Sequence, residues 1–374
     1  MNETYFKPEE RAVFALRELY RGYGYLPFKM SKFEEYDLYV RNKDFLVSDR
    51  IITFTDVGGK LLALKPDVTL SIIKNGEDIP GCKQKVCYNE NVYRVSGSTH
   101  RFKEILQTGL ECIGDLDAYD ICEVVALAAA SLDTISPHFV LDVSHMGILS
   151  ALLDDIAANQ NVRREIARCI AEKNTHDLTR ICTEAGIGSD DTATLCDFVG
   201  IYGDMDSVLA RLTPLCRHHE AAVIALSELT GLRDHLRTTP FADRIRFDFS
   251  IINDMTYYNG VVFCGFLDGI CECVLSGGQY NKLMRRMGRQ AGAIGFALYL
   301  DLLEELDQQT APYDADVLVV YDSAVPPADV AARVAALRAE GKTVSAQRAI
   351  PDKLRYASLC DMRGSSSMRK EGAK

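Results

Sequence analysis

The hydrophobic pattern at the start of the chain predicts a helix. Val13, Leu16 and Tyr20 recur at helical spacing, Pro8 suits a first turn, and two glycines follow the last repeat. Residues 25–70 then alternate short strand-like runs with turn signals such as Val-Gly-Gly-Lys. The N-terminal part therefore predicts one helix followed by short antiparallel strands.

The next segments predict two long strands, a helix and a further strand. Their apolar residues fall in runs bounded by polar turns, at residues 83–95, 102–114, 117–135 and 138–144. Residues 146–240 differ, because short amphipathic segments follow one another with little strand between them. We expect these residues to form a helical insertion.

Strand character returns after the insertion. Apolar and polar residues alternate between residues 244 and 252, with one face formed by Ile245, Phe247, Phe249 and Ile251. This alternation predicts an antiparallel sheet with one face on the core and the other facing a cleft or solvent. Further elements are expected in order: strands at 256–266 and 269–276, a helix after a glycine turn at 277–288, and a strand running into a helix at 293–306.

The C-terminal residues follow a different hydrophobic pattern. A strand at 315–321, a helix at 326–341 and a strand at 342–347 predict a βαβ unit with a parallel strand pair, and residues 352–359 suit one more helix. The final dozen residues are polar, and we expect them to be disordered. The sequence therefore predicts an α+β core over residues 1–310 and a small α/β module over residues 311–374.

Composition narrows the classes of function. With 374 residues the chain is long enough for two domains, and its net charge of −11 disfavours nucleic acid as a partner. No apolar run approaches the roughly 20 residues of a membrane span, and no signal-peptide core is present, so we expect a cytoplasmic protein without a membrane contact.

The cysteine pattern favours free thiols. The twelve cysteines form no CxxC pair, which indicates small buried hydrophobic residues in a reducing compartment better than disulfides or a zinc site. Cys271 and Cys273 are expected on one face of a strand. We expect neither a metal nor a cofactor.

Four segments in order resemble the class II aminoacyl-tRNA synthetase core, and histidyl-tRNA synthetases in particular. Residues 65–69 (KPDVT) resemble the family's Arg-Pro-Glu-x-Thr, and residues 89–114 resemble motif 2. Residues 253–263 (NDMTYYNGVVF) resemble the histidine-specific stretch that normally reads Arg-Gly-Leu-Asp-Tyr-Tyr, and residues 276–303 resemble the motif 3 region. The resemblance implies a class II synthetase-like antiparallel sheet flanked by helices, with a tail similar to the first part of an anticodon-binding domain.

Several residues of the family's nucleotide machinery are absent. The arginine before Gly-Leu-Asp-Tyr-Tyr is Asn253, the motif 3 arginine falls on Leu302, the arginine of Gly-Gly-Arg-Tyr is Gln279, and Ser31 replaces a motif 1 proline. Amino-acid activation builds negative charge on phosphates, and losing one charged donor costs roughly 2.7–4 kcal/mol in analogous cases. The loss of any two of these arginines therefore predicts a fall in the activation rate of about ten-thousandfold or more.

An amino-acid pocket without nucleotide machinery resembles a family of synthetase paralogues, the regulatory subunits of ATP phosphoribosyltransferase in histidine biosynthesis. The resemblance implies a non-catalytic subunit, required for the activity of the short-form catalytic subunit and for feedback inhibition by histidine. It also implies a homodimer within a hetero-oligomer, formed through the N-terminal helix and the motif 1 strand. Two alternatives stay open: a histidyl-tRNA synthetase that activates histidine with ATP, and an amino-acid-binding or activating protein that modifies a protein lysine.

The resemblance assigns the α-amino and α-carboxylate groups of histidine to named residues. Asp67 and Thr69 would take the ammonium, and Gln107 and Arg94 would take the carboxylate. From the residues alone, the alternative for Asp67 and Thr69 is a solvated turn after a strand, and the alternative for Arg94 is a surface salt bridge. Arg101 is a candidate anion contact, with solvent as the alternative.

The imidazole ring is assigned to a second group. Glu111 and Tyr258 would each contact one ring nitrogen, with Tyr257 as a wall beside them. The alternative for two adjacent tyrosines in a strand is one buried and one exposed side chain. His145, just past a strand, is expected to be structural or interfacial. We also expect ordering of residues 96–101 and 253–260 around histidine to alter the surface offered to the catalytic partner.

Overall fold

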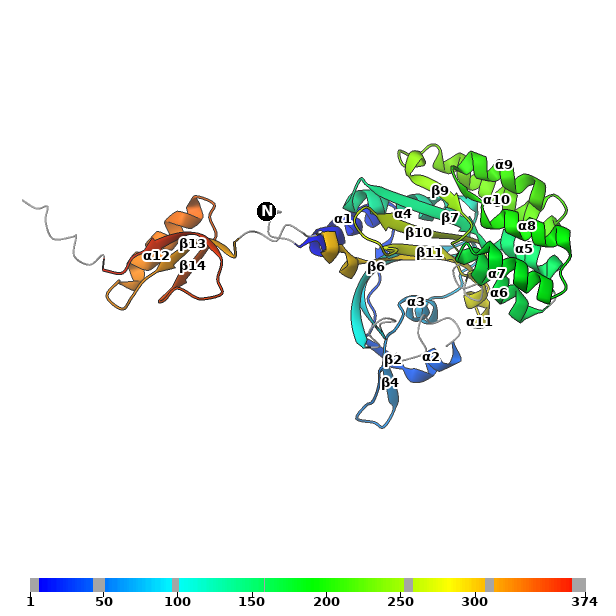
Figure 1. Cartoon of the computed structure of the whole chain (residues 1–374). Helices are drawn as coiled ribbons and strands as arrows, with labels where there is room; N and C mark the ends of the chain where they lie inside the picture. The colour runs from blue at the N-terminus through cyan, green and yellow to red at the C-terminus, as the bar shows by residue number, and fades with distance from the viewer. Residues whose placement is uncertain are drawn as a thin grey trace, which may run out of the picture. The chain divides into compact units, whose positions relative to one another are not determined.

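A nine-stranded sheet is the centre of the first of two units, Met1–Leu306 and Asp307–Lys374 (Figure 1). The computed structural model describes residues 7–42, 51–95, 101–157, 159–251, 258–306 and 313–364. The strand order is β1 (Leu26–Pro27), β5 (Lys83–Val95), β6 (Phe102–Gly114), β12 (Gly292–Tyr299), β11 (Leu275–Gln279), β10 (Val261–Leu267), β7 (Phe139–His145), β9 (Ile245–Asp248) and β8 (Tyr202–Gly203).

The antiparallel centre of this sheet is the one predicted. The strands β5 and β6 pair over their whole length, from Lys83 opposite Gly114 to Val95 opposite Phe102. The ladder continues antiparallel through β12, β11, β10 and β7. The antiparallel prediction holds for β9 on one side only, because β9 pairs antiparallel with β8 and in parallel with β7. A parallel partner is reached here because the chain returns through a long helical crossover.

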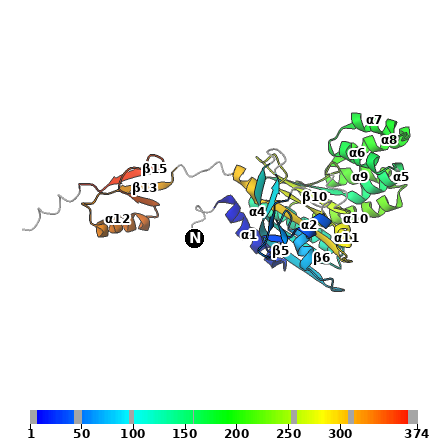
Figure 2. The ribbon, with the colours of Figure 1, turned by 90° about the horizontal axis from the view of Figure 1, so that it is seen from below.

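Helices cover the sheet and extend beyond one end of it. Helix α1 (Pro8–Gly22) packs on α4 (Ala118–Ile135), and α4 contacts β10, β12 and β7. The helical segment predicted after residue 146 is grouped together in two orthogonal views (Figures 1 and 2). It comprises α5 (Met146–Ile156), α6 (Gln160–Ala171), α7 (Thr175–Glu184), α8 (Ser189–Val199), α9 (Met205–Cys216) and α10 (Glu220–Leu236). Within the described ranges, no helix has the length and apolar character to cross a bilayer.

His145 joins the sheet to the first of these helices. Its Nδ1 accepts a hydrogen bond from the Gly147 N–H at 3.2 Å, so it caps α5, and its Nε2 lies 3.0 Å from a Glu228 carboxylate oxygen on α10. That hydrogen bond lowers the pKa of Glu228. The side chain is only 3% exposed, which fits the structural role expected for it.

Replacing His145 with alanine should reduce the free energy of unfolding by about 0.5–2 kcal/mol, the usual cost of losing an N-cap acceptor. Asparagine, which can accept the same backbone hydrogen bond, should restore part of that loss. Urea denaturation of both variants checks this. A loss of ligand affinity at unchanged stability would instead give His145 a role in binding.

A smaller, three-stranded sheet and two short helices form a second part of the same unit. Its order is β2 (Phe33–Glu35), β4 (Leu61–Leu64) and β3 (Thr53–Thr55), flanked by α2 (Tyr36–Arg41) and α3 (Thr69–Asn75). Treating residues 25–70 as strands and turns alone missed both helices. Tyr39 in α2 and Leu70 in α3 are fully buried in a second apolar cluster, so tertiary packing explains two helices that are too short to show a period.

Three predictions between residues 258 and 306 need correction. The strand predicted at 269–276 is wrong over most of its length, because residues 268–274 form a turn and β11 begins at Leu275. Cys271 and Cys273 therefore do not share a strand face. Gly277 and Gly278 belong to β11 and do not form a turn, and the helix that follows, α11, is confined to Asn281–Arg286. The strand β12 runs, as expected, into a helical segment, η4 (Leu300–Leu306), which is 3₁₀. The start of the predicted strand at 256 lies outside the described residues.

The second unit is a three-stranded parallel sheet with one helix. Strand β13 (Ala315–Val320) lies between β14 (Val344–Gln347) and β15 (Tyr356–Asp361), with α12 (Pro327–Ala339) in the crossover. The predicted βαβ unit with its parallel pair is confirmed. The helix predicted at 352–359 is wrong, because residues 356–361 form the third strand. The predicted disorder at the end of the chain falls largely on residues 365–374, which lie outside the described residues.

Candidate functional site

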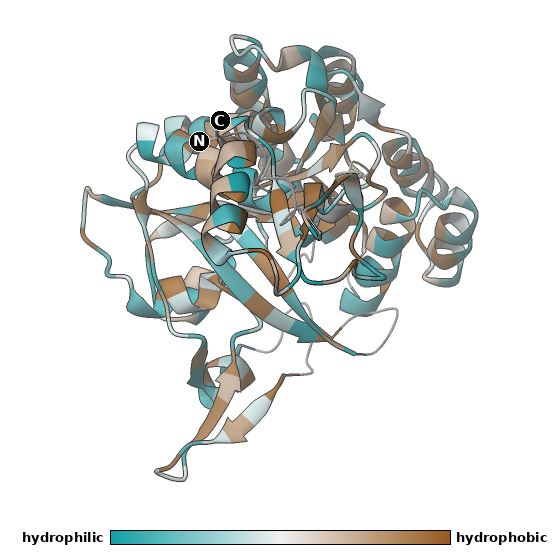
Figure 3. Ribbon diagram, turned by 90° about the vertical axis from the view of Figure 1, so that its left-hand side faces the viewer, coloured by the Kyte–Doolittle hydropathy of each residue, from teal (hydrophilic) through white to brown (hydrophobic). Residues whose placement is uncertain are grey.

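The floor of the candidate site is a row of residues that lie opposite one another on neighbouring strands of the main sheet. Glu111 lies opposite Gly295, which lies opposite Gly278, and the row continues through Val262 to Ser144. A Cβ at Gly295 would overlap the Glu111 carboxylate, and one at Gly278 would lie 2.8 Å from Tyr258 Cδ1. The two glycines thus leave room for one acidic and one aromatic side chain over the strands. Hydrophobic and hydrophilic segments follow one another along the ribbon of the sheet (Figure 3).

Glu111 is held by two hydroxyl donors. Thr69 donates to one carboxylate oxygen at 2.7 Å, and Tyr280 donates to the other at 2.5 Å. The side chain is 2% exposed, and burial raises the pKa of Glu111 to about 8, opposed by the two hydrogen bonds and assisted by the charge of Asp67. Each oxygen keeps a lone pair for a ring N–H, which makes this carboxyl a suitable partner for an imidazole.

The raised pKa of Glu111 gives the stability of the fold a pH dependence. Its folded pKa of about 8 exceeds its ordinary value of 4.5, so the folded chain binds more protons than the unfolded chain between these values. The contribution of Glu111 is complete below about pH 4.5 and declines as the pH rises toward 8, by up to roughly 1.4 kcal/mol per pH unit.

The variant Glu111→Gln should therefore gain stability relative to the native chain as the pH rises from about 4.5 to about 8, the window between the unfolded and folded pKa values of Glu111. Urea titrations of both proteins at several pH values measure this difference. Other titrating groups, such as Asp142, are common to both proteins and cancel. Parallel stability profiles would contradict the assignment.

A cation and an anion lie side by side above this floor. Arg94 Nη2 is 3.9 Å from an Asp67 carboxylate oxygen, and its Nε donates to the Pro66 carbonyl at 2.7 Å. Burial raises the pKa of Asp67, while Arg94 and the Leu70 and Thr69 backbone amides oppose the rise. Both side chains are largely buried, which is inconsistent with the solvated turn and the exposed salt bridge considered for them. Such a pair complements the two charges of an amino acid.

Gln107 has a buried amide donor that lacks a hydrogen-bond acceptor among the described residues. Its side chain is 2% exposed, and its Nε2 has no acceptor within the described part of the chain. A buried amide without an acceptor costs roughly 1–3 kcal/mol, so a ligand carboxylate there would be favoured. The residue lies on β6 four positions before Glu111, on the same face of the strand.

The structure describes two of the remaining predicted residues, Tyr258 and Arg101. Tyr258 is half-buried, and burial raises its pKa well above the ordinary value, with Tyr299 and Glu111 acting in the same direction. Arg101 is exposed just before β6. Tyr257 lies outside the described residues, as do Asn253 and residues 96–100. The structure therefore brings Asp67, Thr69, Arg94, Gln107, Glu111 and Tyr258 to one side of the sheet, consistent with the predicted set.

Two positions that carry arginine in the synthetases have structural roles here. Leu302 packs half-buried against the main core. Gln279 is 8% exposed and its Oε1 accepts a hydrogen bond from the Val261 N–H at 2.7 Å, which ties the end of β11 to the start of β10. Neither side chain offers a positive charge to a phosphate.

Sequence reasoning missed Tyr280 and the two floor glycines. Tyr280 stands next to the Gly-Gly pair in a stretch that resembles the family's Gly-Gly-Arg-Tyr, but no role was assigned to it. The Gly-Gly pair beside Tyr280 was the available signal, and it was interpreted as a turn. A hydroxyl that reaches across the floor to Glu111 follows only from the strand register.

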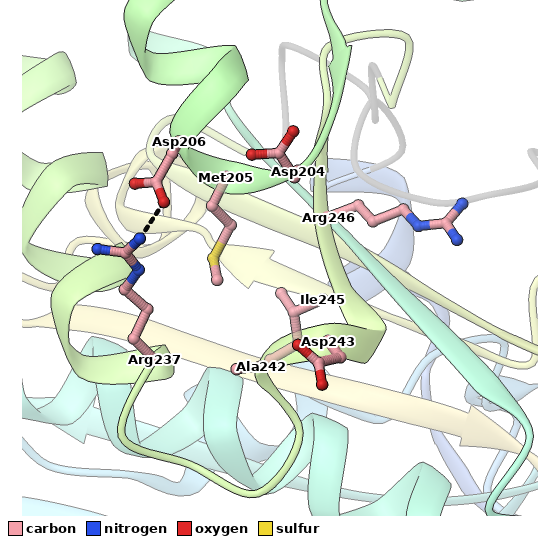
Figure 4. Close-up of a pocket in the computed structure, with 8 residues that line it drawn as sticks. All are labelled: Asp204, Met205, Asp206, Arg237, Ala242, Asp243, Ile245 and Arg246. Atoms are coloured by element: carbon pink, nitrogen blue, oxygen red, sulfur yellow. Dashed lines mark hydrogen bonds and ion pairs between the residues drawn. The ribbon is translucent and has the colours of Figure 1, made fainter.

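A separate cavity of about 310 Å³ lies between the helical insertion and β9 (Figure 4). Charged side chains of both signs line it, among them Asp206 and Arg237, which form an ion pair, and Asp243. Met205 and Ile245 supply its apolar surface. It contains no residue of the predicted histidine set and is distinct from the Glu111 site.

Comparison with known proteins places the chain in a family. The family model described as histidyl-tRNA synthetase matches residues 2–303. The ATP phosphoribosyltransferase regulatory subunit of Oceanobacillus iheyensis is 26% identical over 323 residues, 84% of this chain and 79% of that protein. The regulatory subunit of Clostridium kluyveri is 26% identical over 322 residues, 82% of this chain and 81% of that protein.

Solved structures agree on the fold. An ATP phosphoribosyltransferase regulatory subunit/histidyl-tRNA synthetase from Bacillus halodurans has a TM-score of 0.78 at 23% identity, covering 96% of this chain and 95% of that one. A chain of the ATP phosphoribosyl transferase (HisG:HisZ) complex from Thermotoga maritima has a TM-score of 0.60 at 18% identity, covering 78% and 97%. The predicted class II synthetase-like α+β fold is confirmed, and the chain belongs to the histidyl-tRNA synthetase family.

Proposed function

We propose that this chain is a non-catalytic regulatory subunit of ATP phosphoribosyltransferase, which binds histidine in the Glu111 site. One observation carries the proposal. The buried network of Thr69, Glu111 and Tyr280 is complete, whereas Leu302 and Gln279 stand where the synthetases carry arginines. The site is built for an amino acid and lacks charges that activation of that amino acid would use.

The ligand would lie with its charged end between Asp67 and Arg94. Its carboxylate would also accept from Gln107 Nε2, and its ring would meet Glu111 and Tyr258, which lie on adjacent glycine positions of the floor. Asp67 is one methylene shorter than the family's glutamate, so its contact with the ammonium would be longer or bridged by water. Tyr257 is proposed as a further wall of the same pocket.

Partners are proposed from the names of the relatives and from exposed apolar residues. The relatives named as regulatory subunits imply a short-form catalytic subunit as the partner, in a cytoplasmic hetero-oligomer. A homodimer would cover Phe14, Tyr23 and Leu26, which are 59%, 48% and 67% exposed around α1 and β1. Exposed apolar surface is often used in protein interfaces, so these side chains are candidates for the contact.

Feedback by histidine then requires a difference in affinity between two assembly states. A typical coupling free energy is about 1–3 kcal/mol, a roughly 5- to 150-fold change in affinity. Residues near the pocket that order around the ligand would provide that difference, because they contribute to the surface seen by the partner.

The test uses the full chain and a short-form catalytic subunit. Size-exclusion chromatography and a phosphoribosyl-transfer assay should show co-elution, activity that depends on this chain, and inhibition by histidine. Failure to associate or to restore activity across conditions would refute the regulatory role. ATP–pyrophosphate exchange with histidine, at a turnover near that of synthetases, would establish the alternative function of histidine activation.

A further inference from the structure

Two ion pairs of opposite polarity join residues 65–67 to strand β5. Lys65 Nζ donates to a Glu90 carboxylate oxygen at 2.5 Å, and Arg94 Nη2 lies 3.9 Å from an Asp67 carboxylate oxygen. The segment contributes one cation and one anion to these pairs, and the strand contributes one of each. The formal charges of the four side chains therefore cancel in this wall of the site, which suits a ligand that is itself a zwitterion.

The Lys65–Glu90 pair is the shorter of the two and holds the more buried cation. The side chain of Lys65 is 1% exposed and that of Glu90 is 17% exposed, compared with 12% for Arg94. A buried ammonium is costly unless an opposite charge meets it, so the two side chains depend on each other. The backbone of Lys65 is fixed as well, because its carbonyl accepts a hydrogen bond from the Tyr93 N–H at 3.0 Å.

Glu90 lies directly opposite Gln107 in the ladder between β5 and β6. Residues opposed in this way share a face of the sheet, with Cβ atoms about 4.5–5.5 Å apart. The Glu90 carboxylate nevertheless bonds to Lys65, and the buried Gln107 Nε2 is left without an acceptor in the part of the chain that the structure describes. An uncompensated Glu90 would place a negative charge beside a donor that suits a carboxylate.

We propose that Lys65 is a positioning residue that sets the charge specificity of the site. It holds and neutralises Glu90 beside Gln107, so that this end of the pocket accepts the carboxylate of a zwitterionic amino acid. The inference rests on the proposed function, which assigns the ligand carboxylate to Gln107 and Arg94. Without the Lys65 ammonium, the charge of Glu90 repels that carboxylate, and like charges a few ångströms apart in a partly buried site lower affinity by about tenfold or more.

A purely structural ion pair would give a different pattern of affinities. If Lys65 served only to tie residues 65–67 to β5, its loss would displace Asp67, the proposed partner of the ligand ammonium. Ligands with an ammonium would then bind more weakly, and ligands without one would not. Loss of charge compensation at Glu90 instead weakens the ligands that bring a carboxylate.

Three ligands and the folded full-length chain separate these two roles. The ligands are histidine, histamine, which lacks the carboxylate, and imidazolepropionate, which lacks the ammonium; isothermal titration calorimetry, direct or by displacement, measures each affinity. In Lys65→Met, the affinities for histidine and imidazolepropionate should fall about tenfold or more, and that for histamine should hold or rise. Glu90→Gln should shift the preference the other way, toward ligands with a carboxylate, and it tests the same inference if Lys65→Met does not fold.

Three further variants control for the loss of the side chains themselves. Lys65→Arg keeps the cation and should keep the native order of affinities. The double variant Lys65→Met/Glu90→Gln removes both charges and should regain most of the histidine affinity lost in Lys65→Met. Lys85→Met is the matched control, because Lys85 pairs with Glu123 at the same 2.5 Å from the opposite face of β5. It should leave all three affinities unchanged.

Three outcomes in a native chain that binds histidine would overturn this inference and leave the proposed function standing. They are equal losses for histidine and histamine in Lys65→Met, a loss confined to ligands with an ammonium, and no change in any of the three affinities. A native chain that binds no histidine would instead refute the proposed histidine site, and the inference with it. Titration of the native chain therefore distinguishes the two failures.

Discussion

Replacing Glu111 with glutamine should weaken histidine binding by about 1–3 kcal/mol, roughly 5- to 150-fold, the usual cost of leaving a buried polar group without its hydrogen-bond partner. The amide has one acceptor oxygen in place of two. Thr69 and Tyr280 both donate to the side chain at this position, and the ring of the ligand would donate a third hydrogen bond. With glutamine, one of these three hydrogen bonds is lost. Isothermal titration calorimetry of the full-length chain with histidine measures the change.

Glu123→Gln is the matched control. This second buried glutamate, on α4, is 5% exposed and also accepts from tyrosine hydroxyls, those of Tyr25 and Tyr119. It does not belong to the predicted histidine set, so its replacement should leave the affinity for histidine unchanged. Equal affinity in the native chain and in Glu111→Gln would place the histidine elsewhere.

Replacing Gly295 with alanine should abolish histidine binding and destabilise the fold by roughly 1–3 kcal/mol or more, the usual cost of overpacking. The added Cβ would overlap the Glu111 carboxylate and would lie 2.5 Å from the Leu110 carbonyl oxygen in the neighbouring strand. The Glu111 side chain would have to leave the floor. Urea denaturation and calorimetry with histidine measure the two effects.

Two further variants show whether the clash is the cause. Gly231→Ala lies in an open position of α10 with no atom within 4 Å of the added Cβ, and should stabilise the chain by about 0.5–1 kcal/mol. Adding Glu111→Ala to Gly295→Ala should cost less than the sum of the single changes, because the carboxylate is no longer present to be displaced. Strict additivity would argue against this contact.

The elements that the sequence predicted best are those whose local pattern agrees with their final environment. The strands β5 and β6 were predicted at their observed bounds because polar turns bracket each apolar run. Helix α4 was predicted over residues 117–135 and is observed at Ala118–Ile135, with Asp117 as its N-cap. In these segments the local and the tertiary preferences coincide.

Elsewhere, packing between distant segments outweighed the local signal. Gly277 and Gly278 indicated a turn, yet they lie within β11, where Phe296 and Tyr258 approach too closely for a side chain. Residues 356–361 form a strand because β13 offers an unpaired edge, which no local pattern reveals. The direction of β9 depends likewise on where the insertion returns the chain.

The candidate site was found through motifs, and its connections were not. Thr69 and Tyr280 are 42 and 169 residues from Glu111 in sequence, and only the packing of α3 and the strand register of the sheet bring their oxygens together. Residue types suggested an amino-acid pocket, but the raised pKa of Glu111 depends on burial that composition cannot report. Tyr257 remains a prediction.

The pairing of β7 with β9 also affects the order in which parts of the chain fold. That pairing closes a loop that holds helices α5–α10, and loop closure costs entropy before its contacts form, whereas helices gain from local contacts at once. In pulsed hydrogen-exchange refolding, amides of α6–α8 should become protected earlier than those of β9. Simultaneous protection would contradict this order. The helices would then serve as a template on which the last edge of the sheet assembles.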